Sequence, residues 1–311
     1  MMKSTIRRYF IMGTNSPFID RVSLSDGYVS FFERLLILIG GKVDVLPTLY
    51  GWYHLLCFAI VVALCALVFF KARNLSDKQM DRILGITTAI LVVFEVYKQL
   101  LYTYNPGNDS WVYEWYAFPF QFCSTPMYVM LAAVLIKNEK VRTALYAYLA
   151  TYGLFAGAVV MIYPGDVFST YFGINAQTMI HHGAMVVIGV LMYVSGRAKL
   201  SHKTILKALP VFGIAVAIAL GLNVLYHFFG DPNQTFNMFF ISPYYPCTLA
   251  VLNLFYGKVP YVVFLMIYVL GFTAAGYIMS LIATGSKKLY DIVREKCSSQ
   301  KQNDQPKEGV I

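Results

Sequence analysis

Seven long apolar stretches, separated by short polar segments, dominate the pattern of this sequence. A helix needs roughly 20 predominantly apolar residues to cross the hydrocarbon core of a membrane. The stretches of about that length are residues 52–70, 82–104, 116–136, 141–163, 176–196, 205–229 and 259–283. They predict an all-α polytopic membrane protein in which residues 52–283 form a bundle of seven transmembrane helices.

Basic residues are concentrated in every second connection between these stretches. Residues 71–82, 137–142, 197–207 and the tail after residue 283 contain 17 Lys and Arg, whereas the three alternate connections contain one, Lys258. Cytoplasmic loops carry the excess of Lys and Arg in membrane proteins. The pattern therefore predicts a cytoplasmic C-terminus and a first span that begins on the opposite, outer side, an N-out/C-in arrangement.

The two ends of the chain differ from the central domain. Residues 1–51 carry several Lys and Arg that this orientation places outside; within them, residues 28–39 (YVSFFERLLILI) are apolar on one side, with Glu33 and Arg34 at the water. This pattern favours an interfacial amphipathic helix, and the alternative is a short eighth span. The first fourteen residues lack the apolar core of a signal peptide, so no cleavage is expected. Residues 284–311 are basic and Gln-rich, which is typical of a disordered cytoplasmic tail.

The composition agrees with a membrane protein and argues against other classes. Of the 311 residues, 58% are hydrophobic and 13% are charged, whereas a soluble domain has about half apolar and a quarter charged residues. The net charge of +9 follows from the basic cytoplasmic connections, so it implies no nucleic-acid partner. The five cysteines have neither metal-site spacing nor obvious pairing, and no metal or cofactor is expected.

Polar residues inside the predicted spans gather in the half nearer the outer side. An ionisable residue in a span costs roughly 2.5 to 3.5 kcal/mol on insertion scales, so each one is a functional candidate. When the spans alternate in direction, five of them place polar side chains at one depth: His54, Glu95, Lys98, Gln121, Cys123, His181, His182, Asn223 and His227. This convergence predicts a polar cavity that opens toward the outer face or its lipid leaflet.

Each of these residues also has a purely structural interpretation. Glu95 and Lys98 are three residues apart on one helix and could simply neutralise each other, with Lys98 reaching toward the interface. The histidines, taken singly, could be hydrogen-bond donors between packed helices. It is the shared depth of these groups that favours a function.

Cys123 lies in the densest polar and aromatic stretch, residues 111–126, about one turn inside its predicted helix. Three residues later, Pro126 removes the N–H donor for the carbonyl of Phe122 and is expected to kink the helix beside the thiol. A kink there makes room for a substrate. The alternative is an ordinary buried and inert cysteine.

Two adjacent histidines could activate this thiol. A cysteine becomes a strong nucleophile when a nearby imidazole takes its proton. His181 and His182 lie at the right depth, but adjacent positions on a helix point about 100° apart, so at most one is expected to face Cys123. Gln177 shares a face with His181 and could hold its ring, and Thr178 could do the same for His182.

Three short motifs resemble those of one known family. FPFQFCSTP at residues 118–126, HHG at 181–183 and NQTFNMFFISP at 233–243 are similar to motifs of the YwaF-like integral membrane family, which includes vertebrate transmembrane protein 164. The vertebrate member is described as a cysteine-dependent acyltransferase that moves a fatty acyl chain between glycerophospholipids with a Cys and His pair. The resemblance, over about residues 52–283, implies that Cys123 is the nucleophile and His181 the base, with His182 as the neighbouring alternative.

The leading hypothesis is therefore a lipid O-acyltransferase of a bacterial plasma membrane, acting on phospholipid and lysophospholipid. Candidate substrate-binding residues are Gln121, Glu95, Lys98, Asn223, His227 and Asn237. Among them, Gln121, Asn223 and Lys98 are candidates to stabilise an oxyanion. The competing hypothesis is a solute or proton transporter, or a binding protein, that uses the same outer cavity. Transporters usually also have internal repeats and broken helices, which this sequence does not show.

Overall fold

The computed structural model describes residues 31–303 apart from 42, 44, 106–109 and 166, and of residues 287–303 it describes the backbone alone. Within these residues the fold is helical, with one pair of two-residue antiparallel strands, β1 (Tyr104–Asn105) and β2 (Ser110–Trp111). Most of the predicted N-terminal segment and the last eight residues of the predicted tail lie outside the described residues.

Six helices are long and apolar enough to cross a membrane, and each corresponds to a predicted span. Four are single helices: α3 (Trp52–Lys71), α4 (Asp77–Thr103), α8 (Phe172–Val194) and α9 (Lys203–Phe229). The fifth, Glu139–Ile162, consists of α6 (Glu139–Tyr148), the π-helical turn η3 (Leu149–Gly153) and α7 (Leu154–Ile162). The sixth, Tyr261–Ser286, is the first part of α10 (Tyr261–Asn303). The chain is therefore an integral, multi-pass membrane protein.

The predicted third span differs from the others because its outer part is not helical. A single turn, η1 (Trp115–Ala117), precedes an extended segment, and only Phe122–Leu135 forms a short apolar helix. Phe118, which precedes Pro119, has φ −47° and ψ 135°, and Gln121 is also extended. Proline disfavours the helical conformation in the residue before it. Because 14 helical residues at 1.5 Å each cover less than a bilayer core, the seven-span count stays a prediction.

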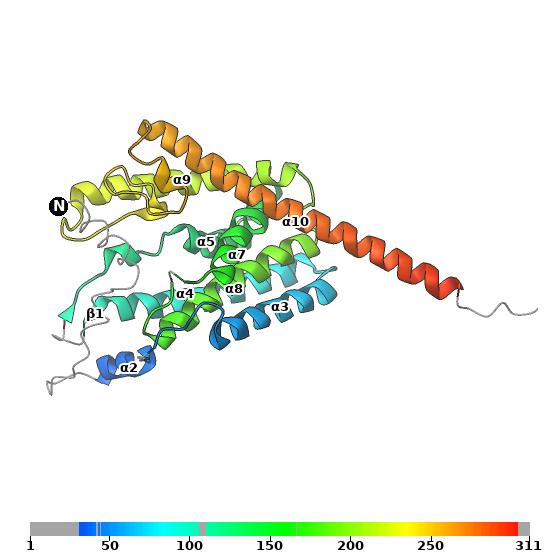
Figure 1. Cartoon of the computed structure of the whole chain (residues 1–311), viewed down its shortest axis with the longest axis horizontal. Coiled ribbons are helices and arrows are strands. Elements are labelled where there is room, and N and C mark those ends of the chain that lie inside the picture. The colour runs from blue at the N-terminus through cyan, green and yellow to red at the C-terminus, as the bar shows by residue number, and fades with distance from the viewer. Residues whose placement is uncertain (1–30, 42, 44, 106–109, 166, 304–311) are drawn as a thin grey trace, which may run out of the picture.

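The connections rich in Lys and Arg and the alternate connections with almost none lie at opposite ends of the bundle. The turn between α3 and α4 and the one between α8 and α9, which carry basic residues, lie at the end from which α10 projects. Helix α2, the strand pair and the loop between α9 and α10 lie at the other end (Figure 1). The predicted N-out/C-in arrangement assigns this second end to the outer side, and that assignment remains a prediction.

Helix α8 is the centre of the bundle and packs against α3, α4, α7 and η3. Glycines at two of these crossings bring the helices close together. A Cβ atom on Gly183 would lie 2.7 Å from Val61 of α3, and one on Gly157 of α7 would lie 2.7 Å from the carbonyl of His182. Small residues permit such close packing between membrane helices. The HHG segment of α8 is therefore held tightly from two sides.

The predicted N-terminal helix is present as α2 (Phe31–Gly40), within three residues of the predicted position. Its Leu36 is buried in a cluster with Leu101, Tyr104 and Tyr171, and the hydroxyl of Tyr97 donates a hydrogen bond to the carbonyl of Ile39, at 2.7 Å. The helix thus packs on the C-terminal end of α4 and the N-terminal end of α8. Its position relative to the membrane interface remains a prediction.

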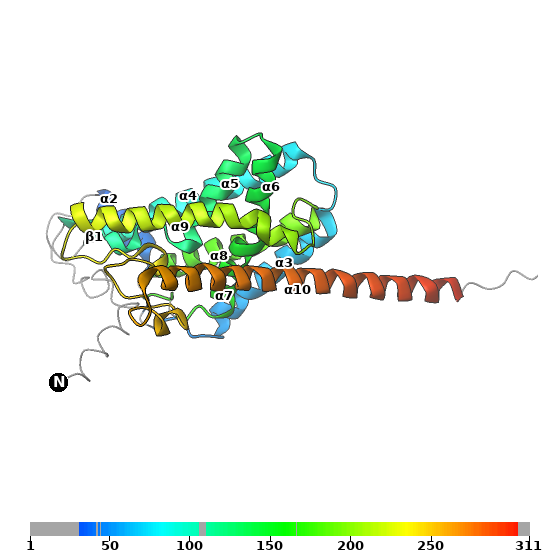
Figure 2. The same cartoon turned by 90° about the horizontal axis from the view of Figure 1, so that it is seen from above.

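The C-terminal part of the chain continues as helix where the sequence predicts a disordered tail. Helix α10 extends through Asn303 and projects beyond the other helices (Figure 2). An apolar span supplies the costly first turns of a helix, and Lys, Arg, Gln and Glu, which are frequent after residue 284, propagate a helix readily. The low hydrophobicity of the residues after 284 indicated disorder, whereas their backbone is helical as far as Asn303.

A buried ion pair at the end of the bundle that carries the basic turns yields a stability prediction. Arg142 is 5% exposed and binds Asp81 at 2.6 Å, whereas Lys137, which binds the same carboxylate at 2.9 Å, is 66% exposed. Arg142→Met removes the buried partner of Asp81 and the hydrogen bonds that Arg142 donates to the hydroxyl of Tyr146, so it should lower the free energy of unfolding by about 2 to 3 kcal/mol. Lys137→Met should cost less than about 1 kcal/mol. Unfolding by SDS in mixed micelles measures both, and equal losses would contradict this assignment.

Candidate functional site

The candidate site lies where three elements meet: η2 (Phe122–Ser124), which carries Cys123, the middle of α8 and the C-terminal half of α4. Cys123 is a half-buried free thiol on a 3₁₀ turn. The next helix, α5 (Thr125–Leu135), begins directly after it, with Pro126 in its first turn. Cys123 is thus located at a change of helix type, and the sequence predicts a kink beside the same thiol.

Hydrogen bonds fix the turn that carries Cys123. The carbonyl of Phe122 accepts the backbone N–H of Thr125 and also its hydroxyl, at 2.7 Å. The same hydroxyl lies 2.5 Å from the hydroxyl of Tyr148, which is fully buried in α6. Thr125 therefore replaces the donor that Pro126 removes, and Tyr148 ties the turn to the neighbouring span. The sequence analysis did not single out either residue.

His181 is bound directly to the residue that carries the thiol. Its Nε2 lies 2.9 Å from the backbone carbonyl oxygen of Cys123. Because a carbonyl only accepts, Nε2 carries the hydrogen in the neutral ring, and this assigns Nδ1 as the unprotonated nitrogen. Nδ1 is buried and has no hydrogen-bond partner among the described residues. The arrangement provides a basic nitrogen inside the bundle that no protein group occupies.

His182 points to a different partner. Its Nδ1 lies 2.8 Å from the backbone carbonyl oxygen of Thr178, one turn earlier on α8. The two imidazole rings are 5.6 Å apart and tilted by 58°. Gln177, expected to hold the ring of His181, instead lies 3.5 Å from the hydroxyl of Thr178. The geometry associates His181, and not His182, with Cys123.

A buried charged group on α4 completes this site. Glu95 is 5% exposed, and its Oε1 accepts hydrogen bonds from Lys98, at 2.8 Å, and from Gln99, at 2.7 Å. The intrahelical pair suggested by the spacing of Glu95 and Lys98 is thus present. Both charges lie within electrostatic range of Cys123 and His181. The residue that the sequence analysis missed is Gln99, although its i, i+4 spacing from Glu95 was a usable signal.

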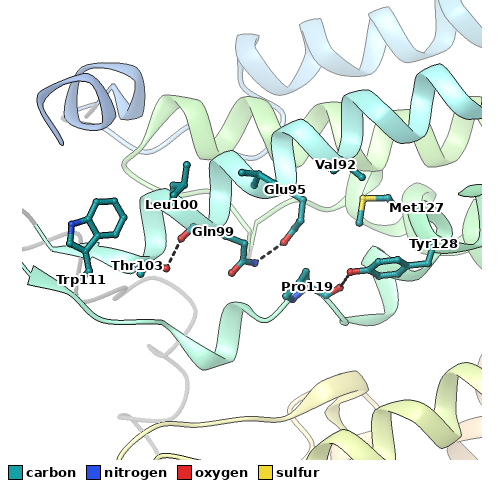
Figure 3. Close-up of a pocket in the computed structure, with 10 residues that line it drawn as sticks. Val92, Glu95, Gln99, Leu100, Thr103, Trp111, Pro119, Met127 and Tyr128 are labelled. Carbon is teal, nitrogen blue, oxygen red and sulfur yellow. Dashed lines mark hydrogen bonds between the residues drawn. The ribbon is translucent and has the colours of Figure 1, made fainter. Parts of the chain in front are cut away.

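An apolar groove of about 380 Å³ opens beside this site, between α4 and the segment that leads into α5. Val92, Val96 and Leu100 line it from α4, and Met127 and Tyr128 line it from α5. Glu95 points from α4 toward the groove (Figure 3). The groove provides an apolar path from the outside of the bundle to a buried carboxylate.

Three other predicted site residues hold the loop between α9 and α10. Gln121 accepts the N–H of Phe239 at 3.1 Å and donates to the carbonyl of Asn237 at 3.3 Å. Asn223 accepts the N–H of Met238 at 2.7 Å and donates to its carbonyl at 3.0 Å. Asn237 accepts from the N–H of Ser242 and donates to the carbonyl of Pro246.

The loop needs these side-chain amides because its backbone is unusual. Phe239 and Phe240 have positive φ values of 59° and 57°, which residues with a bulky side chain rarely adopt. The carbonyl and NH₂ ends of all three amides described above bind backbone groups. This geometry favours a positioning role for them, and their predicted contact with substrate remains a prediction.

The remaining predicted polar residues lie apart from this site. His227 is exposed and stacks on Tyr244, with ring centroids 3.5 Å apart. His54 bridges α3 to α7 through the carbonyl oxygen of Met161, at 2.8 Å. Neither has a hydrogen bond to Cys123 or His181 among the contacts of the described residues. Within the described part of the chain, no cluster of three or more His, Cys, Asp or Glu could hold a metal ion.

Comparison with known proteins agrees with the architecture described above. No curated protein and no solved structure matches this chain. Residues 49–283 match the TMEM164 family; they include five of the six long spans, all but the last three residues of the sixth, and the segments that carry Cys123 and His181. The chain is a member of the TMEM164 family.

Proposed function

We propose that this protein is a membrane-embedded cysteine acyltransferase that moves a fatty acyl chain from a phospholipid to a lysophospholipid through a thioester on Cys123. The observation that carries the proposal is the imidazole of His181. Its Nε2 is anchored on the backbone of Cys123, and its Nδ1 is buried and unoccupied among the described residues. The sulfur of Cys123 has no hydrogen bond to either ring nitrogen of His181 among the described contacts. In the proposed reaction the thiol meets Nδ1 in the substrate complex, where catalytic hydrogen bonds often tighten.

In the first half-reaction the enzyme takes the acyl chain. Nδ1 of His181 accepts the proton of the Cys123 thiol, and the thiolate attacks the ester carbonyl of the phospholipid. A bond forms between sulfur and the acyl carbon, and the carbon–oxygen bond of the ester breaks. The lysophospholipid leaves as an alkoxide that takes the proton from Nδ1.

In the second half-reaction the acyl chain leaves the enzyme. The free hydroxyl of another lysophospholipid gives its proton to Nδ1 and attacks the thioester carbonyl. The new ester bond forms, the sulfur–carbon bond breaks, and the thiolate recovers the proton. Water in place of the lysophospholipid would make the enzyme a lipase, so exclusion of water by the surrounding apolar helices supports transfer over hydrolysis.

Lys98 is the group best placed to favour the charged intermediates. Its ammonium is 17% exposed and lies within electrostatic range of Cys123 and His181. A cation in a low-dielectric site stabilises both a thiolate and the oxyanion of a tetrahedral intermediate. The carboxylate of Glu95 holds this ammonium in place.

Trapping the thioester tests the proposal. Protein incubated with a phospholipid that carries a radiolabelled acyl chain should retain a label that neutral hydroxylamine removes, because hydroxylamine cleaves thioesters. Cys123→Ser should retain no hydroxylamine-labile label. Cys57→Ser, a free cysteine of α3, is the control and should be labelled like the natural protein. Equal thioester labelling of Cys123→Ser would rule out the mechanism.

The two histidines provide a second test with matched variants. In His181→Gln the amide nitrogen can take the place of Nε2 as the donor to Cys123, but the base is lost, so the acyl transfer rate should fall by about 10²- to 10⁴-fold. In His182→Asn the amide nitrogen can replace Nδ1 and keep the bond to Thr178, so most activity should remain. A larger loss in His182→Asn than in His181→Gln would reverse the assignment of the base.

A further inference from the structure

Glu95 links the apolar groove to the proposed catalytic pair. Its side chain lines the groove together with Val92, Val96 and Tyr128, and its charge acts on both Cys123 and His181. Figure 3 shows its carboxylate directed from α4 toward the segment that contains Pro119. A molecule that entered the groove would therefore meet Glu95, within electrostatic range of both reacting residues.

The two oxygens of this carboxylate are used very unequally. Oε1 accepts both hydrogen bonds, from Lys98 and from Gln99, and Gln99 is itself fixed because it also donates to the carbonyl of Ala117, at 2.7 Å. Oε2 is buried and has no partner in the described part of the chain. A buried polar oxygen without a hydrogen bond costs free energy. Oε2 is therefore an acceptor without a donor, which a ligand in the groove reaches once the side chains that cover it move aside.

The surroundings define the chemistry of that ligand. The charge of Glu95 is already neutralised by Lys98 at 2.8 Å, so a second cation would meet repulsion. The groove walls from α4 and α5 are apolar and suit a hydrocarbon chain. A carboxylate oxygen accepts hydrogen bonds and does not donate them. The matching ligand is a neutral donor attached to an apolar chain, which is the chemistry of a lipid with a free hydroxyl.

We propose that the groove binds the lipid acyl acceptor and that Oε2 of Glu95 accepts a hydrogen bond from its free hydroxyl, which places that oxygen for attack on the acyl chain. This inference rests on the proposed function, because the acceptor hydroxyl is the nucleophile of its second half-reaction. A phospholipid with both hydroxyls esterified has no such donor. Glu95 thus distinguishes the acceptor from the donor lipid in the bound state. Because the hydroxyl has one hydrogen, this hydrogen turns from Oε2 of Glu95 to Nδ1 of His181 before the attack, and His181 takes the proton.

Binding without turnover tests this inference. In Cys123→Ser protein in nanodiscs of diacyl phosphatidylcholine, a fluorescent lysophospholipid competes with two unlabelled ligands: the lysophospholipid, and its analogue with hydrogen in place of the free hydroxyl. The hydroxylated ligand should bind about 10- to 100-fold more tightly, as expected for a hydrogen bond to a charged acceptor. Equal affinities would overturn the inference.

Glu95→Gln in the same background removes the acceptor. The amide oxygen is expected to stay with Lys98 and Gln99, which both donate, so the NH₂ group replaces Oε2 in the groove. The preference for the hydroxylated ligand should then fall to about one. A preference that persists in this variant would overturn the inference.

Two tryptophan variants locate the binding site in the groove. Val96 lines the groove and is 53% exposed, so Val96→Trp should obstruct it without disturbing the core and should weaken both ligands by about tenfold or more. Ile90, 46% exposed on α4, does not line the groove, and Ile90→Trp should leave both affinities unchanged. Equal effects of the two tryptophan variants would overturn the location.

The two proposals can fail separately. If the natural protein retains no hydroxylamine-labile label but hydroxyl-dependent binding is observed, the transfer mechanism is rejected and the hydroxyl site is kept.

Discussion

The hydrogen bond between His181 and the backbone of Cys123 is the interaction on which the candidate site depends. It joins the centre of α8 to the turn η2, across 58 residues of sequence. Because it uses Nε2 and a carbonyl, it determines both the direction of the ring and the nitrogen that stays unprotonated. The close packing of α8 at Gly183 and Gly157 restricts movement of this segment. The base is therefore positioned by the same contacts that hold the bundle together.

The second constraint is the buried carboxylate of α4. Glu95 is compensated by Lys98 and Gln99 on one oxygen only, which gives the site a balanced charge and one unsatisfied acceptor. A buried pair in a membrane span is costly, and residues of this kind are retained where they serve a function. Here Glu95 lines the groove, and both members of the pair lie within electrostatic range of Cys123 and His181. Lys98 neutralises the charge of Glu95 through Oε1 and leaves Oε2 without a partner, so the structural and the functional interpretations of this pair are compatible.

Much of the fold follows from the sequence, because hydrophobic length and charge are strong signals. Six spans agree with their predicted positions, and α4 begins at Asp77, directly after Ser76, whose capping box with Gln79 is typical of a helix start. The helix of the third span is shorter than predicted. The apolar residues around Pro119 favoured a helix there, but proline disfavours the helical conformation in the residue before it, and this segment is extended. The helical continuation of α10 was missed for the opposite reason, since polar residues can extend a helix that an apolar segment has begun.

The candidate site was predictable in its residues and less so in their roles. The sequence places Cys123, His181 and Glu95 at one depth, but it does not determine which ring nitrogen each histidine uses. The amides of Gln121, Asn223 and Asn237 looked like ligands for substrate, whereas in the structure they bind the backbone of a loop with left-handed Phe239 and Phe240. No glycine marks that conformation in the sequence, so the need for these amides was not visible.

The central claim concerns the state of one ring, and nitrogen NMR of the protein in lipid bilayers, with ¹⁵N-labelled histidine and His181 assigned by substitution, measures it most directly. In neutral His181 we expect a protonated, hydrogen-bonded Nε2 and an unprotonated Nδ1. A proton on Nδ1, with Nε2 unprotonated, would contradict it.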